Sequence, residues 1–232
     1  SLYLENKFGV VPEDALLQNL EWGLNIPLPI SAKQFIANVV AMPSAQFTYL
    51  DLKQPKMGKV CNRSEYSIKI YDKQAQEKIE QDGNVLRVEI VAKKARYLER
   101  FGARTLADLQ KPEVLAALGQ HLLEKFTDLI YYDNTINEDD LTTREFKNLL
   151  RYQIDRTWVG DENTPVNKFQ RRRMKVSFSK IIEKYGANYS KKFADLALKI
   201  MWLRLNEFTK QSGGVFGVDI FHNLHPENQH LF

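Results

Sequence analysis

The segment 66–76, with the sequence YSIKIYDKQAQ, combines a strand-like alternation with a tyrosine between two lysines. Read at the two-residue period of a β-strand, one side of the segment is apolar and the other carries Lys69, Tyr71 and Lys73. A phenol oxygen acts as a covalent nucleophile once its proton is removed. On this segment alone, a tyrosine packed at the rim of a sheet is the simpler interpretation.

Two further strand-like segments add carboxylates to the same side of the expected sheet. In NLEWGLNI the polar side carries Glu21 and Asn25, and in NVLRVEIV it carries Arg87 and Glu89. Because the apolar sides of these strands must pack under helices, we expect the polar sides to share one open face of the sheet. The members of this face are Glu21, Asn25, Lys69, Tyr71, Lys73, Arg87 and Glu89.

Carboxylates, an amide, cations and a phenol on one surface are suited to phosphodiester chemistry. Glu21 and Glu89 offer hard oxygen ligands for Mg²⁺ or Mn²⁺, with Asn25 as a candidate third ligand. A bound metal would polarise a phosphodiester oxygen, and Tyr71 would attack the phosphorus. A free phenol has a pKa of about 10, so Lys73 and the metal would supply the positive charge that lowers it.

The residues alone also fit a second interpretation without catalysis. Glu, Lys and Arg commonly pair across neighbouring strands of a half-exposed antiparallel sheet. On that interpretation the polar side chains are solvated, and the spacing alone favours this simpler account.

The order of two motifs adds a resemblance to a known family. The run SIKIYDKQAQ, followed by LRVEIVAKKARYLERFGARTLADL, resembles the rolling-circle replication initiators of filamentous phages (the II/X family) and the related Rep_trans initiators of small plasmids. In those families, a strand ending in a Tyr-Asn/Asp-Lys element precedes a strand of the form Leu-Arg-x-Glu and then a helical stretch. The resemblance covers residues 14–110 and extends to about residue 205 only in general character.

The resemblance implies a role for each matching residue. Tyr71 would nick one DNA strand at an origin and stay joined to its 5′ phosphate, which frees a 3′ hydroxyl, and Glu89 would bind Mg²⁺ or Mn²⁺. The upstream pair of acids in the plasmid initiators maps onto Glu21 and Asn25, so an amide replaces the second acid. The His-hydrophobe-His motif of many other initiators is absent from the sequence, which requires a carboxylate-based site.

The resemblance also implies partners and leaves alternatives open. We expect DNA as the partner, as a single strand or a supercoiled origin duplex, with a host helicase as a further partner, in the cytoplasm of a bacterial host. One alternative is a degenerate relative that occupies an origin and regulates replication without cutting. A mobilisation relaxase is a second alternative, which shares the chemistry and differs in its biological setting.

The charge is concentrated in the last third of the chain. The net charge is +4, but residues 168–204 carry 11 Lys and Arg against Glu183 and Asp195, a local balance of +9. Two amphipathic helices here would bind DNA phosphates electrostatically. The expected contacts are Arg171, Arg172, Arg173, Lys175, Lys180, Lys184, Lys191 and Lys192, together with Lys69 and Arg87 of the sheet.

The predicted elements indicate an α+β fold: an antiparallel sheet with helices on one face, as in a Rep-like nicking domain, followed by an all-helical C-terminal region. Strands are expected within 14–26, 46–52, 66–72 and 83–94, and helices at 31–40, 112–132, 142–158, 171–186 and 188–205. Thr142 and Glu145 form a capping-box signature. The expected regions are 1–95, the catalytic sheet; 96–160, a helical extension; and 161–232, a basic DNA-binding region with a tail.

The composition is that of an ordinary globular chain of 232 residues, with 44% hydrophobic residues. The sequence contains no apolar run long enough for a membrane span and no basic and apolar leader pattern. A single cysteine, Cys61, excludes an internal disulfide and favours a reducing compartment. Since the chain does not begin with Met, we expect it to be a fragment that lacks part of its N-terminal region.

Overall fold

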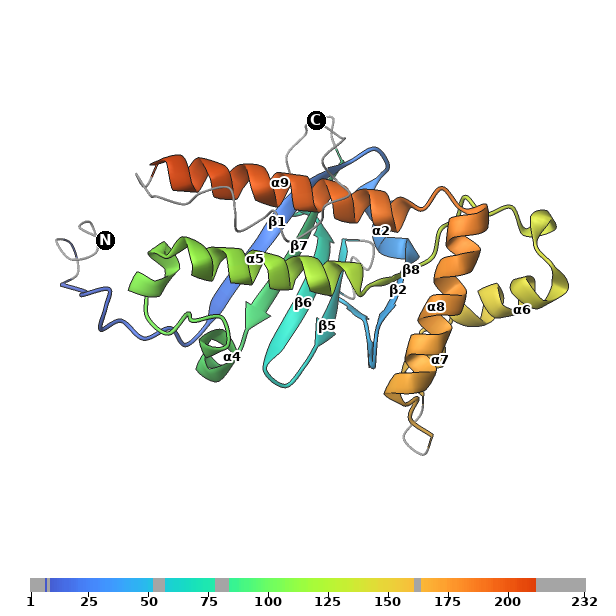
Figure 1. Cartoon of the computed structure of the whole chain (residues 1–232), viewed down its shortest axis with the longest axis horizontal. Coiled ribbons are helices and arrows are strands. Elements are labelled where there is room, and N and C mark those ends of the chain that lie inside the picture. The colour runs from blue at the N-terminus through green and yellow to red at the C-terminus, as the bar shows by residue number, and fades with distance from the viewer. Residues whose placement is uncertain (1–6, 8, 52–56, 78–83, 161–163, 212–232) are drawn as a thin grey trace.

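A five-stranded antiparallel sheet is the centre of the fold. The computed structural model describes residues 7, 9–51, 57–77, 84–160 and 164–211 (Figure 1). The strands of the sheet, in spatial order, are β1 (Leu20–Leu28), β7 (Asn84–Ala92), β6 (Tyr66–Asp72), β5 (Gly58–Asn62) and β4 (Thr48–Tyr49). The mixed α and β architecture with an antiparallel sheet agrees with the expected α+β class.

Short strands and helices complete the described chain. A second sheet has the order β3 (Ala45–Gln46), β2 (Val39–Met42) and β8 (Ile130–Tyr131). The α-helices are α2 (Ala32–Asn38), α3 (Lys73–Glu77), α4 (Ala95–Glu99), α5 (Pro112–Thr127), α6 (Thr143–Tyr152), α7 (Arg156–Val159), α8 (Lys168–Tyr185) and α9 (Tyr189–Gln211). No helix within these described ranges has the length and apolar character needed to cross a bilayer.

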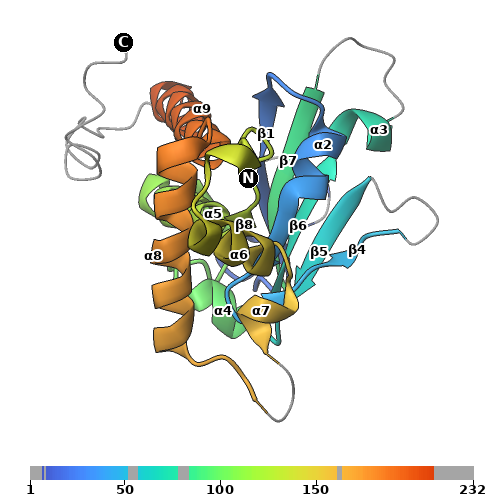
Figure 2. The same ribbon diagram turned by 90° about the vertical axis from the view of Figure 1, so that its right-hand side faces the viewer.

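Helices α5 and α9 lie across one face of the large sheet, as Figures 1 and 2 show from two directions. The apolar sides of β1, β6 and β7 form a buried core with these helices, which includes Ile26, Ile70 and Leu86. Trp22 fixes β1 to α5, because its indole N–H donates to the carbonyl oxygen of Leu118 at 2.9 Å. One face of the sheet is therefore committed to the core.

A second, smaller core joins α6, α7 and α8. Trp158 is its largest fully buried side chain, and the indole N–H donates to the carbonyl oxygen of Tyr152 at 2.9 Å. Phe178 and Ile182 bring the inner face of α8 against this cluster. The inner face of α8 is thus fixed, which leaves its opposite face toward solvent (Figure 2).

Several predicted elements are confirmed. The strands expected at 66–72 and 83–94 are β6 and β7, and they pair in the antiparallel register that sets Lys69 opposite Glu89. The capping box of Thr142 and Glu145 begins α6 with both of its hydrogen bonds formed. The two basic helices are α8 and α9, which a short loop joins as expected.

Other expected elements are wrong in their limits. The helix predicted at 31–40 ends at Asn38, and Val39 begins β2, because these β-branched residues pair with β8. The helix predicted at 112–132 ends at Thr127, and Ile130 and Tyr131 form β8 in place of its last turn. In both cases an apolar run next to a helix pairs with another segment far along the chain.

The first part of the sheet also differs from the expected pattern. Strand β1 continues to Leu28, past the limit expected at residue 26, and Pro27 pairs in register with Val85. Strand β1 is at the edge of the sheet, where a missing backbone N–H does not break the ladder. The strand predicted at 46–52 is divided between β3 and β4, which belong to different sheets, and β5 was not predicted.

Strand β1 approaches β7 closely at Gly23, and we expect an alanine there to destabilise the sheet. A Cβ on Gly23 would lie 2.6 Å from the Cβ of Glu89 and would also meet the carbonyl oxygen of Val88. Gly23→Ala should lower the free energy of unfolding by about 1–3 kcal/mol, as overpacking does in a rigid site. Urea denaturation measures this change.

Gly119→Ala is the matched control for this prediction. A Cβ on Gly119 would lie 2.7 Å from the sulfur of Met201, which is a flexible side chain that can move away. Alanine also favours the helix interior, so Gly119→Ala should stay within about 1 kcal/mol of the unaltered protein. Equal unfolding free energies for the two variants would contradict the close approach at Gly23.

Candidate active site

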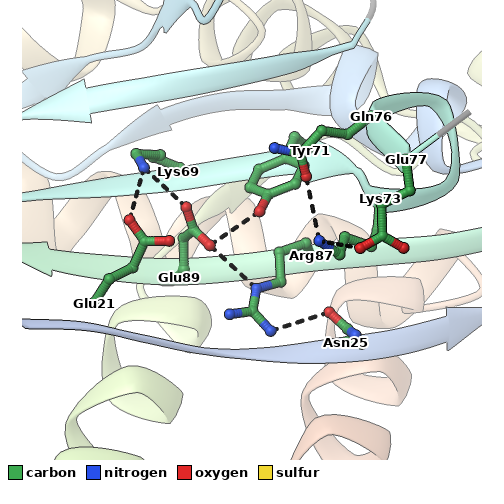
Figure 3. Close-up of polar contacts among 9 residues, drawn as sticks. All are labelled: Glu21, Asn25, Lys69, Tyr71, Lys73, Gln76, Glu77, Arg87 and Glu89. Atoms are coloured by element: carbon green, nitrogen blue, oxygen red, sulfur yellow. Dashed lines mark hydrogen bonds and ion pairs between the residues drawn. The ribbon is translucent and has the colours of Figure 1, made fainter.

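The face of the sheet opposite α5 and α9 carries five of the seven predicted polar residues in two adjacent rows (Figure 3). In the first row, Glu89 of β7 pairs in register with Lys69 of β6 and with Gly23 of β1. In the second row, Arg87 pairs with Tyr71 and Asn25 in the same manner. The prediction that these side chains share one face is confirmed by this register.

Glu89 lies at the centre of the group and is almost completely buried, at 1% exposure. Its Oε1 accepts an ion-pair contact from Lys69 Nζ at 3.0 Å. Its Oε2 accepts from the hydroxyl of Tyr71 at 3.0 Å and from Nε of Arg87 at 3.1 Å. A buried carboxylate is costly unless it is paired and hydrogen-bonded, and these three donors supply that requirement.

The two cations extend the network from Glu89 to β1. Lys69 Nζ also contacts Glu21 Oε2 at 2.9 Å, so one ammonium group bridges two carboxylates. Arg87 donates through Nη1 to the amide oxygen of Asn25 at 3.1 Å. All members of the predicted set except Lys73 therefore form a continuous chain of contacts from Glu21 to Asn25 (Figure 3).

These contacts shift the pKa values of the two partners in opposite directions. Burial alone would raise the pKa of Glu89, but the hydrogen bonds from Lys69 and Arg87 outweigh burial and lower it. Burial alone would lower the pKa of Lys69, but its contacts with Glu21 and Glu89 outweigh burial and raise it. Both groups are charged at neutral pH.

Tyr71 is held in an enclosed position, at 7% exposure. Gly58 of the neighbouring β5 pairs with it in register, and a Cβ on Gly58 would lie 2.5 Å from the Cβ of Tyr71. Burial, and then the negative charge of Glu89, raise the pKa of Tyr71 to about 12. The phenol is therefore protonated at neutral pH and donates its hydrogen bond to Glu89.

The chain leaves the sheet after Asp72, the last residue of β6, which immediately precedes helix α3. The Asp72 carboxylate accepts from the backbone N–H of Ala75 at 3.0 Å, in the manner of an N-cap residue. Lys73, which was predicted to activate the tyrosine, pairs with Glu77 of the same short helix at 2.7 Å. Its ammonium group also donates to Gln76, so both of these partners of Lys73 belong to α3 (Figure 3).

The cations predicted to bind DNA divide into paired and unpaired groups. Arg171 donates to the carbonyl oxygen of Val166. Lys175 pairs with Asp128, and Lys184 pairs with Glu145. Further along, Lys192 lies over the ring of Tyr189, and Lys191 is on α9 with its side chain outside the described part of the structure.

The unpaired group includes cations that were not predicted from the sequence. Arg172, Arg173 and Lys180 on α8 have no hydrogen bond or ion pair within the described ranges. Arg144 and Arg151 on α6 share that property, and they were missed because the charge count covered one continuous segment. The capping box that begins α6 was the available signal that these arginines belong to a helix.

The donors that could hold a metal ion are Glu21 and Glu89. Among the described residues, no group of three or more His, Cys, Asp and Glu side chains is arranged to hold one. The two carboxylates nevertheless converge on one cation, the Lys69 ammonium. Since Mg²⁺ is commonly bound by one or two carboxylates together with substrate phosphates, this donor pair fits such an ion in chemical type.

No family model matches the chain, and no curated protein or solved structure matches it at a significant level. The functional interpretation therefore depends on the site itself.

Replacing the central carboxylate should destabilise the protein more than replacing its exposed neighbour. Glu89→Gln leaves Arg87 without a charged partner and leaves Lys69 with Glu21 alone. We expect it to cost about 2 kcal/mol at pH 7, because both cations are partly exposed. Glu21→Gln should cost less than about 1 kcal/mol, as exposed pairs do. Urea denaturation of the two variants gives both values.

The pH dependence of that difference has a definite sign. The folded pKa of Glu89 is below its ordinary value of 4.5, so its contribution is present above that pH and disappears as pH falls through the folded pKa. The gap between Glu89→Gln and the unaltered protein should shrink as the pH falls below 4.5 and through the lowered folded pKa of Glu89. A gap that stays constant over this range would show that Glu89 is not a stabilising charge.

Proposed function

We propose that this chain is a rolling-circle replication initiator that nicks one DNA strand through Tyr71, and that its sheet is a Rep-like nicking domain. The observation that carries the proposal is the contact of the Tyr71 hydroxyl with Glu89, inside a cluster of two carboxylates and two cations. The order of the two motifs, which resembles that of the phage and plasmid initiators, supports the same assignment. Tyr71 comes from the first motif and Glu89 from the second, and both lie in this cluster.

The proposed reaction is a transesterification. The Tyr71 oxygen attacks phosphorus, a bond forms between them, and the bond from phosphorus to the 3′ oxygen breaks. The 3′ oxygen takes up a proton and leaves as a hydroxyl, while the 5′ phosphate remains joined to the tyrosine. Phosphoryl transfer depends mainly on positioning and charge stabilisation, and Lys69 and Arg87 are the cations nearest to that task.

Tyr71 must lose its proton for this step, and the resting site opposes the loss. Its pKa of about 12 reflects burial and the charge of Glu89. Glu89 is the group in hydrogen-bond reach to accept the proton, which satisfies the geometric condition for a general base. Activation requires more positive charge at the phenol oxygen, from Arg87 or from a bound metal.

A divalent ion, Mg²⁺ or Mn²⁺, belongs to the proposal. Glu21 and Glu89 would hold it. Asn25, the third candidate from the sequence, lies four residues from Glu21 along β1, and its amide oxygen accepts from Arg87. The ion would supply Lewis-acid polarisation of the phosphodiester when bound. Because Lys69 occupies the oxygens of both carboxylates, the ammonium group and the metal compete for one place.

A DNA-binding regulator without nicking activity is the second candidate function. Each carboxylate of the cluster already has a protein cation as its partner, which is also the arrangement of a stable structural network. Origin DNA is the proposed partner in both cases. A relaxase would share the chemistry of the first candidate and differ only in its setting.

Tyr71→Phe separates the two candidates. The variant should form no covalent adduct with supercoiled origin DNA in Mn²⁺, while its DNA affinity stays within about threefold, because a phenylalanine keeps the ring and removes only the nucleophile. Denaturing electrophoresis detects the adduct, and agarose gels detect nicked circles. Absence of an adduct with the unaltered protein, together with retained DNA binding, would establish the regulator.

Lys69→Met tests the competition between ammonium and metal. Removing the ammonium should tighten Mn²⁺ binding by about fivefold, since contacts worth about 1 kcal/mol no longer have to be broken. Electron paramagnetic resonance of free Mn²⁺ measures the affinity without any DNA. Lys33→Met, a change of an exposed lysine on α2, is the control and should leave the affinity unchanged. Unchanged affinity in Lys69→Met would place the metal elsewhere.

A further inference from the structure

A groove between α6 and α8 is lined by arginines from both helices. Its volume is about 560 Å³, and Arg144 and Arg151 contribute from α6 while Arg173 contributes from α8. None of the three has a hydrogen bond or an ion pair with any residue in the described ranges. Three arginines that line one groove without carboxylate partners give it a local excess of positive charge, which favours an anionic ligand.

The groove continues along the outer face of α8. Arg173 also lines a second hollow of about 450 Å³, together with Arg172, Lys180 and the side chain of Phe169. Phe169 is 71% exposed and Val176 is 51% exposed, although the opposite face of the same helix is buried. Phe169 and Val176 therefore line the same hollow as the cations and give it an exposed apolar part.

Cations elsewhere on α8 have a different role. Arg171 holds the segment before the helix through the carbonyl oxygen of Val166, and Lys175 pairs with Asp128 at 2.9 Å. Lys184 pairs with Glu145 of α6. These groups join elements of the fold, which leaves the groove and the outer face of α8 as the cationic surface available to a ligand.

We propose that this groove binds the phosphates of single-stranded DNA, with Phe169 as a stacking platform for a base. The inference rests on the proposed function in that the ligand is DNA, but the surface is separate from the Tyr71 site. Surfaces that bind single strands combine a cationic groove with exposed aromatic side chains, whereas a duplex hides its base faces. Arginine suits phosphate because its planar fork donates two parallel hydrogen bonds.

The test measures binding of fluorescent oligo(dT) by anisotropy, at NaCl concentrations from about 50 to about 300 mM. All proteins carry Tyr71→Phe, so that no cleavage contributes. The groove variant is Arg144→Gln, Arg151→Gln and Arg173→Gln together. The control removes three exposed cations elsewhere, Lys33→Gln, Lys94→Gln and Arg104→Gln, and therefore makes the same change in net charge.

The groove variant should bind at least tenfold more weakly at low salt. The slope of log affinity against log salt should become less negative by about 2, which is three phosphates at about 0.7 each for a single strand. Phe169→Ala should weaken binding at least fivefold without changing the slope, since it removes stacking and no charge. The charge-matched control should change the slope by less than about half as much as the groove variant.

Several results would overturn the proposal. An unchanged slope in the groove variant would place the phosphates elsewhere. Tighter binding of a duplex of the same length, with no effect of Phe169→Ala, would assign the surface to duplex DNA. Poly-glutamate at the same concentration of negative charges should leave oligo(dT) bound. If it displaces oligo(dT), the groove is an unspecific anion site, such as an acidic protein would use.

Folding and the proposed function are controlled separately. Circular dichroism checks the groove variant, and Arg173→Gln alone, with an expected slope change of about 0.7, replaces it if the triple variant does not fold. If the protein with intact Tyr71 forms no adduct while the groove behaves as expected, the nicking function fails and the binding site stands. If the protein with intact Tyr71 forms the adduct while the groove variant binds DNA normally, only the proposed binding site fails.

Discussion

The burial of one carboxylate, that of Glu89, determines how the site is arranged. At 1% exposure this group cannot rely on water, so its two oxygens need protein donors. Lys69, Tyr71 and Arg87 supply these donors. The pairing register of β6 with β7 places Lys69 and Tyr71 beside Glu89, and Arg87 lies two residues before Glu89 on β7. The packing of α5 and α9 on the other face holds these strands flat against the core. The core therefore fixes the register of the strands, and that register gives the buried Glu89 carboxylate its hydrogen-bond and ion-pair partners.

The shared face of the sheet was predictable because alternation along a strand is a local property. Strands that bury one side must present the other, and Glu21, Lys69, Tyr71 and Glu89 follow from that rule. The contacts between them were not predictable in the same way. Which oxygen of Glu89 faces which cation depends on the pairing of segments that lie up to 68 residues apart, from Glu21 to Glu89.

The elements that were missed are short apolar segments whose structure depends on distant partners. Val39–Met42 and Ile130–Tyr131 contain no period that separates a strand from a helical turn, and they become β2 and β8 because they pair with each other. The basic surface was missed for a related reason. A count along the sequence groups residues 168–204, whereas the unpaired arginines come together from α6 and α8, which meet only after folding.

The hydrogen bond from Tyr71 to Glu89 stabilises the resting site and opposes the proposed chemistry. The four ionised side chains of the cluster, Glu21, Glu89, Lys69 and Arg87, sum to zero, so the site has no surplus charge to stabilise a phenolate. A phosphodiester brings a negative charge that would draw a cation away from Glu89. As Glu89 loses that partner, its pKa rises toward its ordinary value, and it becomes a better acceptor for the phenol proton. In this way the binding of the substrate and the activation of the nucleophile would be coupled through one carboxylate. In a protein that only binds DNA, the ion pairs of Glu89 with Lys69 and Arg87 would stay intact.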